Sequence, residues 1–363
     1  MNKKLPDLKI RDLIINPPII QGGMGVAVSK AKLAAAVSNT GALGVIASVG
    51  LGKKSKMKQE YEKASAEALE NEIIAARKLT SGPMGVNIMA TLNNYDSLVK
   101  VCVKNNAEVI ISGSGLPLKL PRLVENSNIK LVPIVSSGRA AELICAVWQK
   151  RFKRLPDALV VEGPLAGGHL GFRLEELSNI ENFTLERLVT DVLTVARKYE
   201  RFLAMKIPVI AAGGIFDGKD IARMLKLGAS GVQMATRFVC TYECDVSDAY
   251  KDAYLKTKKE DILIIDSPVG LPGRVIKNEF VERILKGEKI KFKCHYKCLK
   301  TCDEKTVSYC IADALVNSAK GDMKNGFAMC GTNAYRVKKI VSVKELIDEL
   351  IVEASEEFNK DRK

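Results

Sequence analysis

His169 is the side chain in this sequence best suited to proton chemistry. It is one of two histidines among 363 residues, and it stands in the run Gly167-Gly168-His169-Leu170-Gly171. An imidazole titrates near neutrality, so it can take up or release a proton at physiological pH. The flanking glycines predict an open loop rather than a helix or strand. We therefore expect His169 to act in catalysis or in polarising a substrate, and a purely structural histidine is the alternative.

Glycine-rich loops follow a series of short apolar runs along the chain. Glycine lets the backbone approach a ligand closely and direct its N–H groups toward it. Together these loops predict one ligand site, and glycines that only form tight turns are the alternative. The loops are Gln21–Gly25, Asn87–Met89, Ser112–Gly115, Glu162–Gly171, Ala212–Gly214 and Ala235–Arg237.

Two of these loops have the composition of a phosphate cradle. Gly213 and Gly214 precede a helix that is expected to start near Asp217, and Ala235 and Thr236 supply backbone donors from the opposite side. In a barrel of alternating strands and helices, the last two loops commonly bind phosphate. Because the other loops also have features of ligand size, we expect a phosphorylated cofactor rather than a phosphorylated substrate.

The cysteines gather in one late segment. Cys294, Cys298 and Cys302 are four positions apart, Cys310 follows, and His295 lies among them. Four thiolates could hold zinc or an iron–sulfur cluster. On a helix the outer two of the first three cysteines would stand about 12 Å apart, so ligation would require a loop. A metal or cluster on these four cysteines, and free reduced thiols, are the two alternatives.

The elements that must position these residues are eight short runs rich in β-branched residues. Each run is continuously apolar, as expected for strands buried on both faces of a parallel sheet. Helical periodicity lies between them, which favours an α/β fold of the (β/α)8 TIM-barrel type. The competing doubly wound open sheet lacks a nucleotide fingerprint after its first strand. The runs are 18–21, 43–46, 85–88, 108–111, 131–134, 158–161, 208–211 and 231–234.

The alternation stops after Cys240. Residues 1–244 are expected to form the barrel, and residues 245–310 a smaller cap or insert domain that contains a helical stretch and the cysteine-rich segment. Residues 311–363 are expected to form C-terminal helices that pack back on the barrel. The helices predicted between the strands are 32–38, 56–78, 95–104, 140–150, 184–199 and 218–227, with 311–319 and 343–353 after the cap.

Composition narrows the class of protein. Apolar residues make up 47% of the chain and the net charge is +14. No apolar run approaches the roughly 18 residues of a membrane span, and no signal peptide precedes the first strand, so a cytoplasmic protein is expected. No nucleic-acid-binding motif accompanies the charge. The basic surface therefore predicts anionic substrates, an acidic partner, or solvation alone.

An ordered set of motifs resembles the nitronate monooxygenase family, formerly the 2-nitropropane dioxygenases. This family includes the FMN-dependent enoyl-acyl-carrier-protein reductases. The match extends over most of the barrel. Its motifs are Gln21–Gly25, Leu33–Asn39 with Gly41–Gly44, Gly85–Met89, Glu162-Gly163 with Ala166–His169, Pro208–Ile215 and Gly231–Phe238.

The resemblance implies a TIM barrel that binds FMN non-covalently beneath a small cap. It implies that Gly213, Gly214, Ala235 and Thr236 hold the phosphate, and that Gln233 points toward the cofactor. The residues that it places at the flavin ring or over its reactive face are Gly22, Gly23, Met24, Asn87, Gly167, Gly168 and His169.

The resemblance leaves two activities. We favour nitronate monooxygenase activity, in which O2 and FMN convert an alkyl nitronate to a carbonyl compound and nitrite. The alternative is an enoyl-acyl-carrier-protein reductase that uses FMN and NAD(P)H, which Gly22-Gly23-Met24 and the run Gly273–Asn278 resemble. The basic surface would suit an acidic acyl carrier protein. A homodimer is compatible with either activity.

Two further classes of protein remain as competitors. One is a flavin-independent barrel that uses the same phosphate cradle on a phosphorylated sugar. The other is a binding protein or redox sensor built on the cysteines. Glu162 and Arg274 are interpreted as partners in a salt bridge or in local hydrogen bonds, and neither is given a catalytic role.

Overall fold

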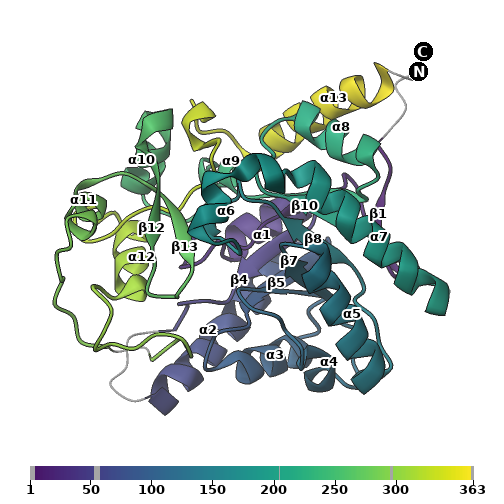
Figure 1. Cartoon of the computed structure of the whole chain (residues 1–363), viewed down its shortest axis with the longest axis horizontal. Helices are drawn as coiled ribbons and strands as arrows, with labels where there is room; N and C mark the ends of the chain where they lie inside the picture. The colour runs from purple at the N-terminus through teal and green to yellow at the C-terminus, as the bar shows by residue number, and fades with distance from the viewer. Residues whose placement is uncertain (1–4, 53–57, 204, 295–296, 361–363) are drawn as a thin grey trace.

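The eight predicted strands form one parallel sheet that closes into a barrel (Figure 1). The computed structural model describes residues 5–52, 58–203, 205–294 and 297–360. Around the barrel the order is β3, β11, β10, β8, β7, β6, β5 and β4, and a parallel bridge between Ile20 and Leu43 closes the ring. The predicted (β/α)8 TIM barrel is confirmed. The strands are β3 (Ile19–Gln21), β4 (Gly44–Ala47), β5 (Met84–Met89), β6 (Val109–Gly113), β7 (Lys130–Val135), β8 (Leu159–Glu162), β10 (Val209–Ala212) and β11 (Gly231–Met234).

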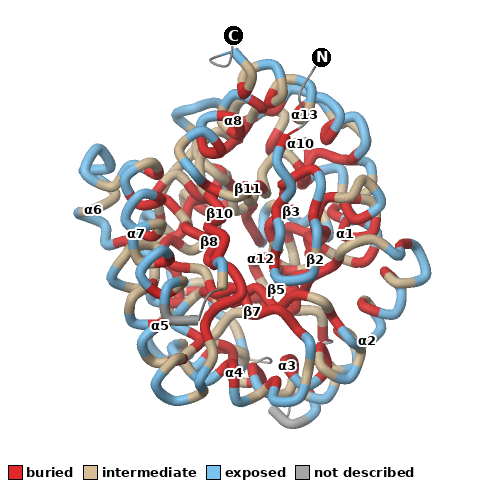
Figure 2. Tube along the Cα trace, turned by 90° about the vertical axis from the view of Figure 1, so that its right-hand side faces the viewer, coloured by how far each residue is buried: buried red, intermediate tan, exposed pale blue. Residues whose placement is uncertain are grey.

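Both faces of these strands are buried, which explains their unbroken apolar runs. In β6, Val109 and Ile111 belong to the core inside the barrel, whereas Ile110 packs in the larger core under the helices. Figure 2 shows the strands as a buried centre inside a partly exposed shell. Burial on both faces is typical of parallel sheets covered by helices.

An unpredicted hairpin lies against the interior core. Its strands β1 (Leu8–Ile10) and β2 (Leu13–Ile15) pair antiparallel. Leu8, Ile10 and Ile15 are fully buried in the core inside the barrel. The sequence pattern did not reveal this hairpin, because each strand has three residues and charged residues interrupt the apolar pattern.

Helices cover the outside of the barrel where the periodicity predicts them. A capping box between Asp217 and Asp220 starts α8 and so fixes the end of the loop after β10. None of the described helices is both long and apolar enough to cross a bilayer. The helices are α1 (Ala31–Ser38), α2 (Lys58–Leu79), α3 (Tyr95–Lys104), α4 (Leu120–Leu123), α5 (Gly138–Phe152), α6 (Leu174–Ser178), α7 (Leu185–Leu203), α8 (Gly218–Leu227) and α9 (Thr236–Val239).

The cap is built on a three-stranded sheet that the sequence did not reveal. Its order is β12, β13 and β9, with all pairs antiparallel. The middle strand β13 pairs with Gly168 and His169, which form β9, so His169 lies on a strand and not in the open loop that was expected. In Figure 1, α10, α11 and α12 surround β12 and β13. The elements are β9 (Gly168–His169), α10 (Asp248–Lys256), β12 (Ile262–Asp266), β13 (Pro272–Ile276), α11 (Glu279–Leu285) and α12 (Ile311–Ala319).

The last helix, α13 (Val343–Asn359), returns to the barrel and lies beside α8 (Figure 1). The Glu353 carboxylate accepts a hydrogen bond of 2.8 Å from the Gly218 N–H at the start of α8. Gly218 is needed there, because a Cβ atom would come within 2.3 Å of the Ala354 nitrogen. The domain limits at 244/245 and 310/311 stay predictions.

The seam where β3 meets β4 depends on the buried side chain of Gln21. Its Oε1 accepts a 3.0 Å hydrogen bond from the Val45 N–H, and its Nε2 donates to Ser29 Oγ at 2.9 Å. Ser29 Oγ in turn accepts a hydrogen bond from the Met24 N–H at 2.9 Å. One amide therefore joins two strands and fixes the loop that follows β3.

Replacing Gln21 with alanine should lower the free energy of unfolding by about 2–4 kcal/mol, because buried partners would lose their hydrogen bonds. Urea denaturation of both proteins measures the change. Gln149→Ala is the matched control, since that amide is half-buried on α5 and forms no hydrogen bond within the described residues. Equal stability of the two variants would show that the seam does not depend on Gln21.

Candidate active site

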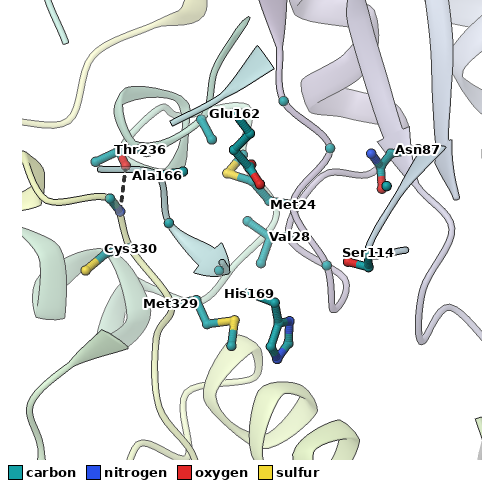
Figure 3. Close-up of a pocket in the computed structure, with 18 of the residues that line it drawn as sticks. Met24, Val28, Asn87, Ser114, Glu162, Ala166, His169, Thr236, Met329 and Cys330 are labelled. Carbon is teal, nitrogen blue, oxygen red and sulfur yellow. Dashed lines mark hydrogen bonds between the residues drawn. The ribbon is translucent and has the colours of Figure 1, made fainter. Parts of the chain in front are cut away.

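One cavity at the carboxyl ends of the strands brings together all twelve residues that were predicted to bind the cofactor or act in catalysis (Figure 3). The barrel positions most of them, and β9 of the cap sheet adds Gly168 and His169. We call this the first cavity. The twelve residues are Gly22, Gly23, Met24, Asn87, Gly167, Gly168, His169, Gly213, Gly214, Gln233, Ala235 and Thr236.

The loop after β3 forms one wall of the first cavity. The Gly22 N–H donates a 2.7 Å hydrogen bond to the Met234 carbonyl at the end of β11. At Gly23, a Cβ atom would stand 2.4 Å from the Asn87 Cβ, so no side chain fits. The wall is therefore bare backbone beside an amide, a surface that can receive a flat aromatic ring.

The loops after β10 and β11 form the opposite wall. Gly213 and Gly214 have φ angles of +92° and +86°, which favour glycine. Within the described residues, the N–H groups of Gly214, Ala235 and Thr236 have no hydrogen-bond acceptor. Unpaired N–H groups that converge at the carboxyl ends of strands are what a phosphate requires.

A strap from the cap, residues Met329 to Asn333, crosses this wall. The Gly331 N–H donates to Thr236 Oγ1 at 3.1 Å, and Asn333 Nδ2 donates to the Gly214 carbonyl at 2.7 Å. The strap also explains Gly167, where a Cβ atom would lie 2.5 Å from the Cys330 carbonyl carbon. The cap and the predicted phosphate cradle are thus held together by hydrogen bonds.

Two features of the first cavity still call for a ligand. Gln233 Oε1 is buried and has no hydrogen-bond partner among the described residues. A Cβ atom on Gly168 would meet nothing within 4 Å. A buried acceptor without a donor is costly, so a ligand N–H would stabilise it. These features fit FMN, although the contact of each residue with it stays a prediction.

The cap orients the ring of His169 through one hydrogen bond. Its Nε2 lies 2.8 Å from Ser267 Oγ, which also accepts a 3.3 Å hydrogen bond from the Val269 N–H. Either atom can donate in the bond between His169 and Ser267, and the ring proton is on Nδ1 when Ser267 is the donor. Burial lowers the pKa of His169 to about 4, so the ring is neutral at pH 7.

Glu162 ends β8 and lines the same cavity as His169 (Figure 3). Burial raises the pKa of its carboxyl group to about 7. The interpretation that Glu162 pairs with Arg274 is wrong. Arg274 donates to the Ala166 carbonyl instead, and no ion pair to Glu162 forms within the part of the chain that the structure describes.

A second cavity of about 770 Å³ adjoins the first. Both cavities are lined by Ser114, Ile134, Glu162 and His169. Apolar side chains supply much of the remaining wall, and three charged residues complete it. The apolar residues include Leu116, Val135, Ala140, Phe172, Leu174, Leu271 and Pro272, and the charged ones are Arg173, Glu176 and Asp266.

The predicted metal site on Cys294, Cys298, Cys302 and Cys310 is not supported. Within the described residues, no three His, Cys, Asp or Glu side chains come together to hold a metal ion, and His295 lies outside those residues. Burial raises the pKa of Cys298 to about 12 and that of Cys310 to about 11, which favours thiols over metal-binding thiolates. Cys298 instead lines the first cavity, and Cys298 and Cys310 pack against a small apolar cluster.

Sequence reasoning missed the cap residues that complete the site. Ser267 begins a run of seven residues that holds two prolines and two glycines, and it lies 98 positions from His169. Met329, Cys330 and Gly331 line the first cavity without any local motif. The sequence analysis named Glu162 but gave it no catalytic role. Only the fold determines that none of the described cations pairs with its carboxyl group, so no pattern in the sequence could show it.

Comparison with known proteins places the chain in a family. A model of the nitronate monooxygenase family matches residues 7–95 and 89–353. The chain belongs to this family. The family and its relatives indicate an oxidoreductase enzyme.

Three relatives illustrate the range of this family. A probable nitronate monooxygenase of Staphylococcus aureus is 30% identical, and the match covers 75% of this chain and 78% of that protein. A (3aS,4S,5R,7aS)-5-hydroxy-7a-methyl-1-oxo-octahydro-1H-indene-4-carboxyl-CoA dehydrogenase of Mycobacterium tuberculosis is 28% identical over 76% of this chain and 67% of that protein. The structure of FabK from Thermotoga maritima aligns over 96% of both chains with 31% identity and a TM-score of 0.75.

Gly23→Ala should prevent flavin from being retained, because the new methyl group collides with Asn87 and displaces the wall of the first cavity. Visible absorbance of the purified protein, relative to its total protein, measures bound flavin. The control is Gly138→Ala, at the helical start of α5 and outside the first cavity, where the nearest neighbour of a Cβ atom is the Asp191 Cβ at 3.2 Å. Full flavin content in Gly23→Ala would contradict the placement of the ring against this wall.

Proposed function

We propose that this chain is an FMN-dependent enzyme that reduces the carbon–carbon double bond of an enoyl thioester with NAD(P)H. The observation that carries the proposal is the charge of the site. Among the described residues that line the first cavity there is no lysine or arginine, and His169 is neutral. Such a site suits an uncharged thioester better than an anionic nitronate, whose charge would lack a partner.

The second cavity supports the same substrate class. Its volume and apolar lining suit an acyl chain. The match to Thermotoga FabK over nearly the whole of both chains is in keeping with this proposal. The net charge of +14 would favour approach of an acidic acyl carrier protein.

The residues of the chain have separate tasks in this reaction. FMN, when bound, supplies hydride chemistry between the nicotinamide and the substrate. With Ser267 as the donor to Nε2, the His169 Nδ1–H is free to donate a hydrogen bond to the thioester carbonyl. The cap roof over the cavity, which includes Cys298 and Met329, limits access of water to the reacting carbon atoms.

Nitronate oxidation is the second candidate, and it was favoured by the sequence. The family model and the staphylococcal relatives support it. In that reaction a nitronate would have to bind beside the Glu162 carboxyl group, where no cation lines the first cavity among the described residues.

An anaerobic visible spectrum separates these candidates. Bleaching of the flavin band by NADH or NADPH, followed by its return when an enoyl thioester is added, is the result expected of the reductase. Bleaching by propyl-2-nitronate, with no response to either nicotinamide, would establish nitronate oxidation instead. Protein that carries no flavin would contradict both activities.

His169→Ala should retain flavin and lower kcat/KM for the thioester about 10²- to 10⁴-fold, because the carbonyl loses its hydrogen-bond donor. Steady-state kinetics and visible absorbance measure the two effects. Ser267→Ala should lower kcat/KM less, because it removes the hydrogen bond to His169 Nε2 but keeps the imidazole ring. Parallel loss of flavin and activity in His169→Ala would show that the residue is structural.

A further inference from the structure

Glu162 is a half-buried residue whose carboxyl group the reaction described so far does not use. It is the only carboxylate lining the first cavity among the described residues, and it also lines the second. We propose that Glu162 donates the proton that the substrate takes up at its α-carbon. This inference rests on the proposed reductase function and names the acid of that same site.

The position of Glu162 supports this role. It is the last residue of β8, where the carboxyl ends of barrel strands carry the catalytic groups of such enzymes. It shares the wall between the two cavities with His169. Within the described residues, its carboxyl group takes part in no hydrogen bond or ion pair, so no protein partner withholds its proton.

The groups around Glu162 leave it available as an acid near neutral pH. The titratable groups that line the cavities with it are neutral His169, Tyr250, Tyr254, Cys298 and Cys330 on one side, and Arg173, Glu176 and Asp266 on the other. Burial is the only cause of its raised pKa of about 7, with no contribution from these charges. Arg274, the nearby buried cation, is occupied by the Ala166 carbonyl.

The proton and electron balance of the reaction requires such a group. Reduction of the double bond places a hydride equivalent, supplied by NAD(P)H, on the β-carbon and a proton on the α-carbon. The O–H bond of Glu162 breaks as the new C–H bond forms, and the carboxylate then regains the proton that the reaction consumes from the solvent. Neutral His169 keeps its Nδ1 proton for the carbonyl oxygen, so the two groups do not compete.

The test follows the half-reaction in which the reduced protein is reoxidised by an enoyl thioester without oxygen. The wild-type rate should fall about tenfold for each pH unit above the titration near pH 7, because only the protonated acid reacts. Glu162→Gln should be about 10²-fold slower at pH 6 and should no longer show that titration. Glu175→Gln, a substitution of an exposed carboxylate on α6, is the control and should behave as wild type.

A second measurement does not depend on turnover. Infrared difference spectra between wild type and Glu162→Gln should show a protonated carboxyl band at pH 6 that disappears as the pH rises through about 7. Glu162→Asp, which keeps an acid, should restore part of the rate and the pH dependence. Visible absorbance confirms that each variant has folded around its flavin.

The outcomes are distinguishable. A Glu162→Gln variant that retains the wild-type rate and pH profile would overturn the role of Glu162 and leave the reductase function intact. Loss of flavin with no change in the pH profile of the remaining protein would also overturn it, and would make Glu162 a cofactor-binding residue. Failure of the wild-type reduced protein to react with any enoyl thioester would overturn the proposed function and this inference together.

Discussion

The Gln21 side chain joins the two ends of the barrel sheet to the loop that forms the first wall of the site. Its amide satisfies the Val45 N–H across the seam and holds Ser29, which in turn fixes the Met24 N–H. A closed barrel has no free edge, and the contact between β3 and β4 completes its ring of eight strands. The carboxyl ends of all eight strands then surround one opening. The glycine loops can converge on one ligand only because that ring is closed.

Burial then sets the chemistry of this mouth. It pushes the pKa of His169 down to about 4 and that of Glu162 up to about 7, so both groups favour their neutral forms. With no arginine or lysine among the described residues that line the first cavity, no cation there reverses the shift of the Glu162 pKa. The result is a site with hydrogen-bond donors but little net charge, which is the environment of a neutral carbonyl compound.

The same shifts affect stability in opposite directions over nearly the same pH range. The native protein keeps a proton on Glu162 up to about pH 7, whereas the unfolded chain releases it near its ordinary value, so this group lowers stability as pH rises between them. His169 resists protonation until about pH 4, so it lowers stability as pH falls below its ordinary value. An isolated buried carboxyl group therefore carries a cost that packing elsewhere in the fold must offset.

The barrel could be predicted from the sequence because its strands depend on local composition, whereas the cap could not. Runs such as 109–113 are buried on both faces, and that condition leaves a continuous apolar pattern. β9 has no such pattern, because Gly168 and His169 become a strand only by pairing with β13 about a hundred positions later. The spacing of the cysteines predicted a metal, but burial favours protonated thiols, and spacing alone carries no information about burial.

The division between barrel and cap also separates the two groups of the proposed reaction. Glu162 belongs to β8, while His169 is oriented by Ser267 and by the pairing of β9 with β13. The strap from Met329 to Asn333 is hydrogen-bonded to the loops after β10 and β11. The position of the cap and the shape of the predicted phosphate cradle therefore depend on the same contacts. A change in the cap can therefore alter the hydrogen bond to the substrate carbonyl without disturbing the acid on the barrel. Such independence would allow relatives with one barrel to act on different substrates.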